Sequence, residues 1–120
     1  MRGLSKSYKE NVEYLDKALR VDESFDLLKK IMKIGSDEIT MYYIDGFVKD
    51  GVMSKLMTYF LSLNGLGDSG EQSANDFLEA HLPYVEAEVT KDIDKMISTM
   101  LSGAALMLGS TFGETAILID

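Results

Sequence analysis

Apolar residues recur at steps of three and four along parts of the chain, the spacing that places them on one face of a helix. This spacing predicts four helices, over residues 5–19, 52–63, 73–82 and 91–101. Ser5 or Ser7 can cap the first helix and Thr90 the last, because a hydroxyl oxygen accepts a free backbone N–H. Pro83 stops the third helix, and Gly103 closes the fourth.

Three kinds of run predict strands: runs rich in β-branched and aromatic residues, runs that alternate between apolar and polar residues, and short continuous apolar runs. They cover residues 39–44, 84–89, 104–108 and 115–119. The last two flank a glycine-containing turn and predict a hairpin. The run over 84–89 is expected to be half exposed, near an edge of the sheet. Asp45 and Gly46 end the first run, because glycine accepts the positive φ of a tight exit.

The segment over residues 24–34 fits two structures. Ser24 could cap a helix that carries Phe25, Leu28 and Ile31 on one face. A glycine-containing turn follows directly and leads into the strand over 39–44, which instead fits the first half of a hairpin. The pattern of residues alone leaves helix and strand equally open.

The order of these elements predicts an α/β (α+β) fold, a mixed β-sheet of about five strands with two hairpins, packed by three to four helices. The chain has 120 residues and is expected to form one soluble domain over residues 1–120. Residues 64–72 are rich in Gly, Ser and Asp and predict a loop.

Charge and cysteine content narrow the classes of function. The formal net charge of −8 argues against nucleic acid and against anionic lipid as partners, because both reward clustered Lys and Arg. The chain contains no cysteine, which excludes disulfides and thiolate metal sites. No apolar run reaches the roughly 18 residues that a membrane span requires, and the start lacks the apolar core of a secretory signal.

Three sets of residues are candidates for chemistry. Residues 65–70 match the glycine spacing of dinucleotide-binding loops but follow a predicted helix instead of a strand, so a plain loop is the better interpretation. His81 is the only histidine and is expected to be a surface or partly packed residue. Asp45 and Asp50 flank a strand exit, where two carboxylates could hold Mg²⁺ or exchange protons, although Asp and Gly are also ordinary turn residues.

No nucleophile paired with a base can be assembled from the sequence. The chain is therefore predicted not to be an enzyme, with no catalytic residue, no metal site and no cofactor. Two alternatives stay open: a small enzyme that uses Asp45, Asp50 and His81, and a small-ligand module with its cleft near residues 45–51.

Methionine and tyrosine positions indicate packing. Methionine is a flexible core filler, with adaptable interfaces as its other common use. Core positions are predicted for Met41, Met53, Met57, Met96, Met100 and Met107. Tyr42 and Tyr43 point to opposite faces of a strand, so one of them is expected to be exposed to a partner.

Four segments carry a family resemblance. They are the opening helix around residues 8–15, the strand exit Tyr43-Ile44-Asp45-Gly46-Phe47, the helix end Leu101-Ser102-Gly103, and the aliphatic runs at 104–108 and 115–120. In this order they resemble the N-terminal cytosolic region of A subunits in the GerA family of spore germinant receptors. Leu108-Gly109-Ser110 departs from that family, where an Ile-Asp-Gly turn often follows the first of the late strands.

The resemblance implies a strand over 25–34 paired with 39–44. It also implies a non-enzymatic domain that acts in receptor assembly and signal relay during nutrient-triggered germination, with interaction residues at 43–47 and 101–103. The implied partners are a transporter-like membrane subunit and a lipoprotein, with self-association as a further option and no nucleic acid. The parent protein would lie in the spore inner membrane, with this domain on the cytosolic side and joined to the membrane only through a downstream region.

Overall fold

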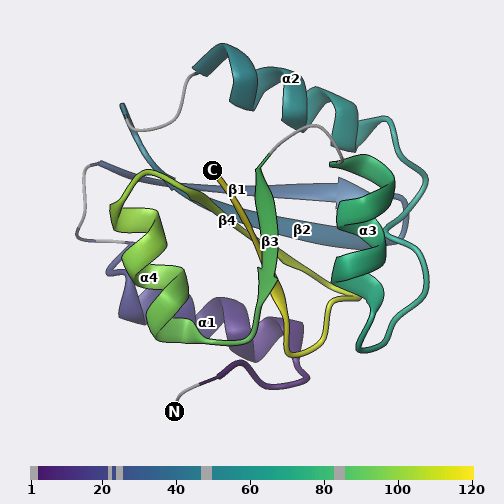
Figure 1. Cartoon of the computed structure of the whole chain (residues 1–120), viewed down its shortest axis with the longest axis horizontal. Helices are drawn as coiled ribbons and strands as arrows, with labels where there is room; N and C mark the ends of the chain where they lie inside the picture. The colour runs from purple at the N-terminus through teal and green to yellow at the C-terminus, as the bar shows by residue number, and fades with distance from the viewer. Residues whose placement is uncertain (1–2, 22, 24–25, 47–49, 83–85) are drawn as a thin grey trace.

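A five-stranded sheet forms the middle of the molecule, with helices on both of its faces (Figure 1). The structure is a computed structural model, and it describes residues 3–21, 23, 26–46, 50–82 and 86–120. Its elements are α1 (Tyr8–Ala18), β1 (Leu27–Ile34), β2 (Asp37–Ile44), α2 (Asp50–Leu61), α3 (Ser73–His81), β3 (Ala87–Thr90), α4 (Ile93–Leu101), β4 (Ala105–Gly109) and β5 (Ala116–Ile119). The α+β class, the five strands and both hairpins that the sequence predicts are confirmed.

The strands lie in the order β1-β2-β4-β5-β3, and all four pairings are antiparallel. The prediction of a mixed sheet, with both parallel and antiparallel pairs, is therefore wrong. β3 and β4, which α4 connects, run in the same direction, but β5 inserts between them and forms an antiparallel pair with each. β3 lies at an edge of the sheet, as its alternating sequence predicts.

The ambiguous segment forms strand β1, paired with β2 over its full length. Its side chains alternate in burial, with Met32 and Ile34 buried while Ile31 and Lys33 are exposed. The helix interpretation is wrong because β2 is available to pair with the backbone of this run along its whole length, and the family resemblance indicated the correct structure. Residues 24 and 25, the first of the ambiguous run, lie outside the described residues.

Hydrogen bonds at the start of α1 hold the N-terminal segment in place. Ser7 caps the helix, one of the two predicted caps, and its hydroxyl accepts the N–H of Glu10 at 3.2 Å. Asn11 is buried and accepts the Ser5 N–H at 2.8 Å, while its amide donates to the Ser5 and Gly113 carbonyl oxygens at 2.9 and 3.3 Å. The buried amide therefore ties the first residues to the β4–β5 turn.

The start of α4 corrects one predicted cap. Asp92, not Thr90, is the N-cap, because its carboxylate accepts the N–H groups of Asp94 at 2.9 Å and Lys95 at 3.4 Å. The Thr90 hydroxyl instead accepts the Asp92 N–H at 3.1 Å and so orients the cap residue. The other end is as predicted, with Gly103 at a φ of 118° just after the helix.

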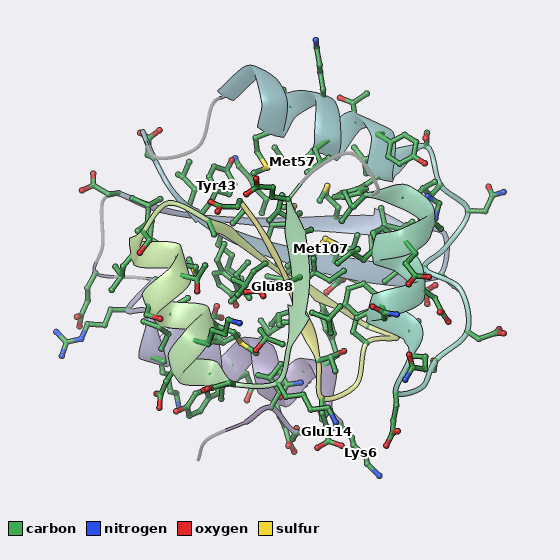
Figure 2. The ribbon with its side chains drawn as sticks, viewed as in Figure 1. Lys6, Tyr43, Met57, Glu88, Met107 and Glu114 are labelled. Atoms are coloured by element: carbon green, nitrogen blue, oxygen red, sulfur yellow. The ribbon has the colours of Figure 1, made fainter. Side chains whose placement is uncertain are left out.

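Each face of the sheet packs a separate hydrophobic core. One core lies against α2 and α3 and the other against α1 and α4. Tyr42 and Tyr43 point into opposite cores, with relative exposures of 0% and 6%, so the prediction that one is exposed is wrong because helices cover both faces. Figure 2 shows Tyr43 and Met57 between α2 and the sheet. The predicted methionines line these two cores.

The β1–β2 turn abuts the loop that follows α2. Gly35 has a φ of 64°, and a Cβ there would lie 2.8 Å from the carbonyl carbon of Asn64. The loop is fixed from the other side by Asp37, whose carboxylate accepts the Leu66 N–H at 2.9 Å. Because α2 and not a strand precedes residues 64–72, the plain-loop interpretation of its glycines is confirmed.

We expect Gly35→Ala to destabilise the protein more than Gly113→Ala. Both glycines have a φ near 60°, but nothing lies within 4 Å of a Cβ at Gly113. Gly113→Ala should lower the free energy of unfolding by about 1–2 kcal/mol, the cost of a left-handed conformation, and Gly35→Ala by a further 1–3 kcal/mol or so from overlap with backbone. Urea unfolding of both variants measures the difference, and equal losses would contradict the described turn–loop contact.

Candidate functional site

Two of the predicted interaction segments meet at one apolar hollow at the ends of α1 and α4. Ile44, the last residue of β2, and Leu101, the last residue of α4, both line it. The volume of this α1–α4 hollow is about 320 Å³, and its other lining residues are Leu19, Asp26, Leu27, Ile97 and Met100. In Figure 1 both helices end on the left of the view, near the start of β1. The fold therefore joins segments that are far apart in the sequence.

Leu101 has the most exposed apolar side chain at this site. Its relative exposure is 63%, whereas Met96 and Met100 on the same helix are at 0% and 1%. Successive residues of a helix are rotated by about 100°, so the residue after an inward Met100 turns away from the core. Leu101 consequently stands at the rim of the hollow and contributes little to the core beneath it.

Carboxylates lie beside the hollow. The Asp45 N–H donates to the backbone oxygen of Asp26 at 2.7 Å, which brings the exit of β2 next to the entry of β1, and both residues are exposed. Arg20 directly follows Leu19 in the sequence, and its guanidinium pairs with the Glu23 carboxylate at 3.8 Å. None of the residues that line the hollow is basic.

Two helix C-termini add partial negative charge to the charge of these carboxylates. α1 ends at Ala18 with Leu19 as its C-cap, and α4 ends at Leu101, so both helices finish at the hollow. The last carbonyl groups of a helix carry a partial negative charge. The last turn of α1 contains Lys17, but the last turn of α4 contains no basic residue to offset that charge.

A polar link holds α1 against the sheet beside the hollow. The Tyr42 hydroxyl donates to Oδ1 of Asp16 at 2.8 Å, and Nζ of Lys29 donates to Oδ2 at 2.8 Å. Burial, together with the adjacent Asp16 carboxylate, raises the pKa of Tyr42 well above its usual range, so the phenol remains a donor. Asp16 lies shortly before Leu19 and Lys29 shortly after Leu27, so the link fixes two walls of the hollow.

A second link holds the start of α1. The Tyr8 hydroxyl lies 2.6 Å from Oγ1 of Thr40 and donates to Oε2 of Glu38 at 3.0 Å. Burial raises the pKa of Tyr8, and the hydrogen bond from Lys33 lowers the pKa of Glu38. Because both ends of α1 are hydrogen-bonded to the β1–β2 hairpin, the helix keeps one orientation over the sheet.

The remaining predicted interaction residues that the structure describes do not line the hollow. Tyr43 is buried toward α2, and Gly46 takes a φ of 88° at the exposed exit of β2. Ser102 is exposed, and its hydroxyl donates to the Ser98 carbonyl oxygen at 3.2 Å at the end of α4. Phe47 lies outside the described residues.

His81 belongs to an aromatic cluster in the α2–α3 layer. Its Nδ1 lies 2.9 Å from the Tyr59 hydroxyl, and its ring centroid lies 4.7 Å from that of Phe77. The prediction of a partly packed histidine is confirmed. Asp45 is not among its contacts, and the side chain of Asp50 lies outside the described residues. Among the residues that the structure describes, no three His, Cys, Asp or Glu side chains are grouped to hold a metal ion.

A second hollow, of about 400 Å³, lies among the N-terminal segment, the entry to α3 and the β4–β5 turn. Charged residues of both signs line it: Lys6, Glu71, Lys91 and Glu114. Lys6 and Glu114 appear together at the lower edge of Figure 2. The hollow also includes the buried Thr111, whose hydroxyl lies 2.8 Å from that of Ser73.

Comparison with known proteins assigns the chain to a family. The sequence model described as Bacillus/Clostridium GerA spore germination protein matches residues 13–120. The chain belongs to the GerA family. This confirms the family that the ordered motifs of the sequence resemble, and no sequence among curated proteins matches the chain.

The fold of this GerA-family chain is also similar to that of a solved structure. That structure is the crystal structure of the N-terminal domain of the A subunit of the Bacillus megaterium spore germinant receptor GerK3, with a TM-score of 0.76 and 18% sequence identity. The match covers 98% of this chain and 47% of the other, so the chain spans about half the length of the solved domain. Within the described part of the chain, none of the helices combines the length and apolar character needed to span a bilayer.

Sequence reasoning missed several walls of the hollow. Leu19 and Ile97 lie at the apolar spacing of two separate predicted helices, but nothing in the sequence indicates that these two faces end at one place. Asp26 had no distinguishing signal at all. Among the lining residues, the family resemblance indicates only Ile44 and Leu101.

We expect Tyr42→Phe to loosen α1 without changing the fold. The substitution removes the hydroxyl donor from Asp16 and should lower the free energy of unfolding by about 1.5–3 kcal/mol, the range for a hydrogen bond to a charged group. Urea unfolding at neutral pH measures it. Tyr59→Phe is the matched control, since the Tyr59 hydroxyl bonds to His81 at the surface and its loss should cost less.

The same variant tests the raised pKa of Tyr42. The unfolded chain loses this proton near pH 10, whereas the folded chain retains it, so this contribution to stability is complete below pH 10 and declines as the pH rises further. Tyr42→Phe should therefore lose less stability than the unaltered protein above pH 10. Parallel alkaline profiles for the two proteins would contradict the burial and charge described for the phenol.

Proposed function

We propose that this chain is the first subdomain of the cytosolic N-terminal domain of a spore germinant receptor A subunit, and that it acts in receptor assembly and signal relay without catalysing a reaction. The observation that carries the proposal is the GerA family match over residues 13–120. The similarity of fold to the N-terminal domain of the GerK3 A subunit supports the position within such a receptor. The parent protein would then lie in the spore inner membrane and reach it through sequence downstream of this subdomain.

The α1–α4 hollow is the surface that we assign to assembly. Its apolar walls are only partly covered, since Leu19, Leu27, Ile44 and Ile97 are half buried and Leu101 is largely exposed. An apolar side chain from a partner would remove this surface from water, which is the main favourable contribution to protein association. The proposed partners are the other subunits of the receptor, a transporter-like membrane subunit and a lipoprotein.

Leu101→Ser tests this assignment. The substitution should weaken co-purification of the full-length A subunit with its receptor partners by at least about tenfold, as expected when a central apolar anchor is removed. It should leave the free energy of unfolding within about 0.5 kcal/mol, because an exposed side chain contributes little to the core. Leu61→Ser is the matched control, since Leu61 is 57% exposed but lies at the end of α2 on the other face.

Retention of the partners by Leu101→Ser would remove the hollow from assembly. Loss of partners by both serine variants would show that exposed leucines act non-specifically. Failure of the unaltered protein to co-purify with any receptor subunit would remove the assembly role itself.

Small-ligand binding is the second candidate function. The second hollow supports it, because Lys6, Lys91, Glu71 and Glu114 offer charges of both signs around a buried hydroxyl pair. This location differs from the cleft near residues 45–51 that the sequence suggested, part of which lies outside the described residues.

A panel of amino acids and sugars in a thermal-unfolding assay tests the ligand-binding candidate. A ligand present at ~100 times its Kd should add about 2.7 kcal/mol to the free energy of unfolding. Glu114→Gln should then abolish the shift if the second hollow is responsible. A panel in which no compound raises the unfolding temperature would eliminate this function.

A further inference from the structure

We infer that the α1–α4 hollow receives an apolar side chain from a basic segment, one in which Lys or Arg residues flank the apolar anchor. The inference rests on the proposed assembly role and specifies the chemistry of the partner. It follows from three separate features of the site: its apolar interior, its acidic margin and the two helix ends that meet there.

The interior of the hollow selects an apolar anchor. Six of its seven lining residues are Leu, Ile or Met, and the seventh is Asp26. A volume of about 320 Å³ exceeds that of any single side chain, so a leucine, methionine or aromatic residue can enter with its neighbours close to the walls. A charged or strongly hydrated group would gain no partner from the six apolar lining residues and would be desolvated at a cost.

The margin of the hollow selects positive charge beside that anchor. Asp26 lines the hollow, and its backbone oxygen accepts the Asp45 N–H, so a second exposed acidic residue is the direct neighbour of the first. Arg20 does not offset them, because it is already paired with Glu23. A Lys or Arg on the partner could pair with these carboxylates as soon as the apolar anchor is seated.

The end of α4 at the hollow favours the same charge. α4 ends there at Leu101, and its last turn carries no basic side chain. The partial negative charge on its final carbonyl groups extends over about one turn and attracts cations. An acidic side chain and a helix C-terminus therefore both lie at one apolar hollow.

This chemistry fits the cytosolic flank of a membrane-embedded partner. Segments next to membrane spans on the cytosolic side are enriched in Lys and Arg, and they end in apolar residues where the span begins. A second copy of this chain fits less well, since its net charge is −8 and each copy would bring its own carboxylates to the contact. An anionic lipid surface also fits poorly, because its negative charge would repel that of the chain.

The experiment measures binding of a short fluorescent peptide by this chain. The probe contains adjacent leucines flanked on both sides by lysine and arginine, and two matched peptides replace either the basic residues by glutamate or the leucines by serine. We expect only the first peptide to bind. Leu101→Ser should weaken its binding at least about tenfold by removing apolar contact.

Charge is tested with a double variant and with salt. Asp26→Asn with Asp45→Asn should weaken binding of the basic peptide about three- to tenfold, and raising the salt from ~50 to ~300 mM should weaken it similarly, because exposed charges are screened. Asp68→Asn with Glu79→Gln is the matched control, since it removes the same charge from exposed positions away from the hollow. This control should bind as the unaltered chain does.

The same variants in the full-length receptor separate this inference from the proposed function. Leu101→Ser could release the receptor partners while the Asp26 and Asp45 variant retains them at every salt concentration. In that case the assembly role stands, and the inference of a basic partner is wrong. Equal binding of the basic and the glutamate peptides would also overturn the inference, and so would dimers of this chain that depend on Leu101. Loss of partners in both hollow variants, with retention by the Asp68 and Glu79 variant, supports it.

Discussion

The double pairing of β2 is the interaction on which the rest of this structure depends. β2 is hydrogen-bonded to β1 along its full length and to β4 on its other side. Its alternate residues are buried on both faces, with Met41 and Tyr43 in one core and Tyr42 in the other. One eight-residue strand thereby joins the two layers of helices into a single unit, and neither core could form if β2 were displaced.

The position of the candidate site follows from that strand. β2 leaves the sheet at Ile44, and the bond between Asp45 and Asp26 returns the chain beside the entry to β1. On the face that Tyr42 enters, α1 and α4 both pack on the sheet and both end at this exit. The hollow exists because two helices stop where two strands begin and end, and no described element covers the gap between them.

Most of the elements could be predicted from the sequence because their patterns are local. The period of apolar residues located the helices, and β-branched runs located four strands. β1 could not be assigned, since its eight residues fit a helix face as well as a strand until β2 is seen to pair with it. The hollow could not be predicted either, because Leu19, Ile97 and Ile44 come together only through packing of separate elements.

Contact at this hollow would act on both helices and on β2 at once. Leu19 belongs to the end of α1 and Leu101 to the end of α4, while Ile44 continues directly from Tyr42 and Tyr43. Tyr42 is hydrogen-bonded to Asp16 in α1, and Tyr43 packs beneath α2 on the opposite face. A partner seated against Ile44 therefore contacts a strand whose side chains reach both cores. Binding at the margin is then connected to the far layer of helices by a continuous path of packed residues.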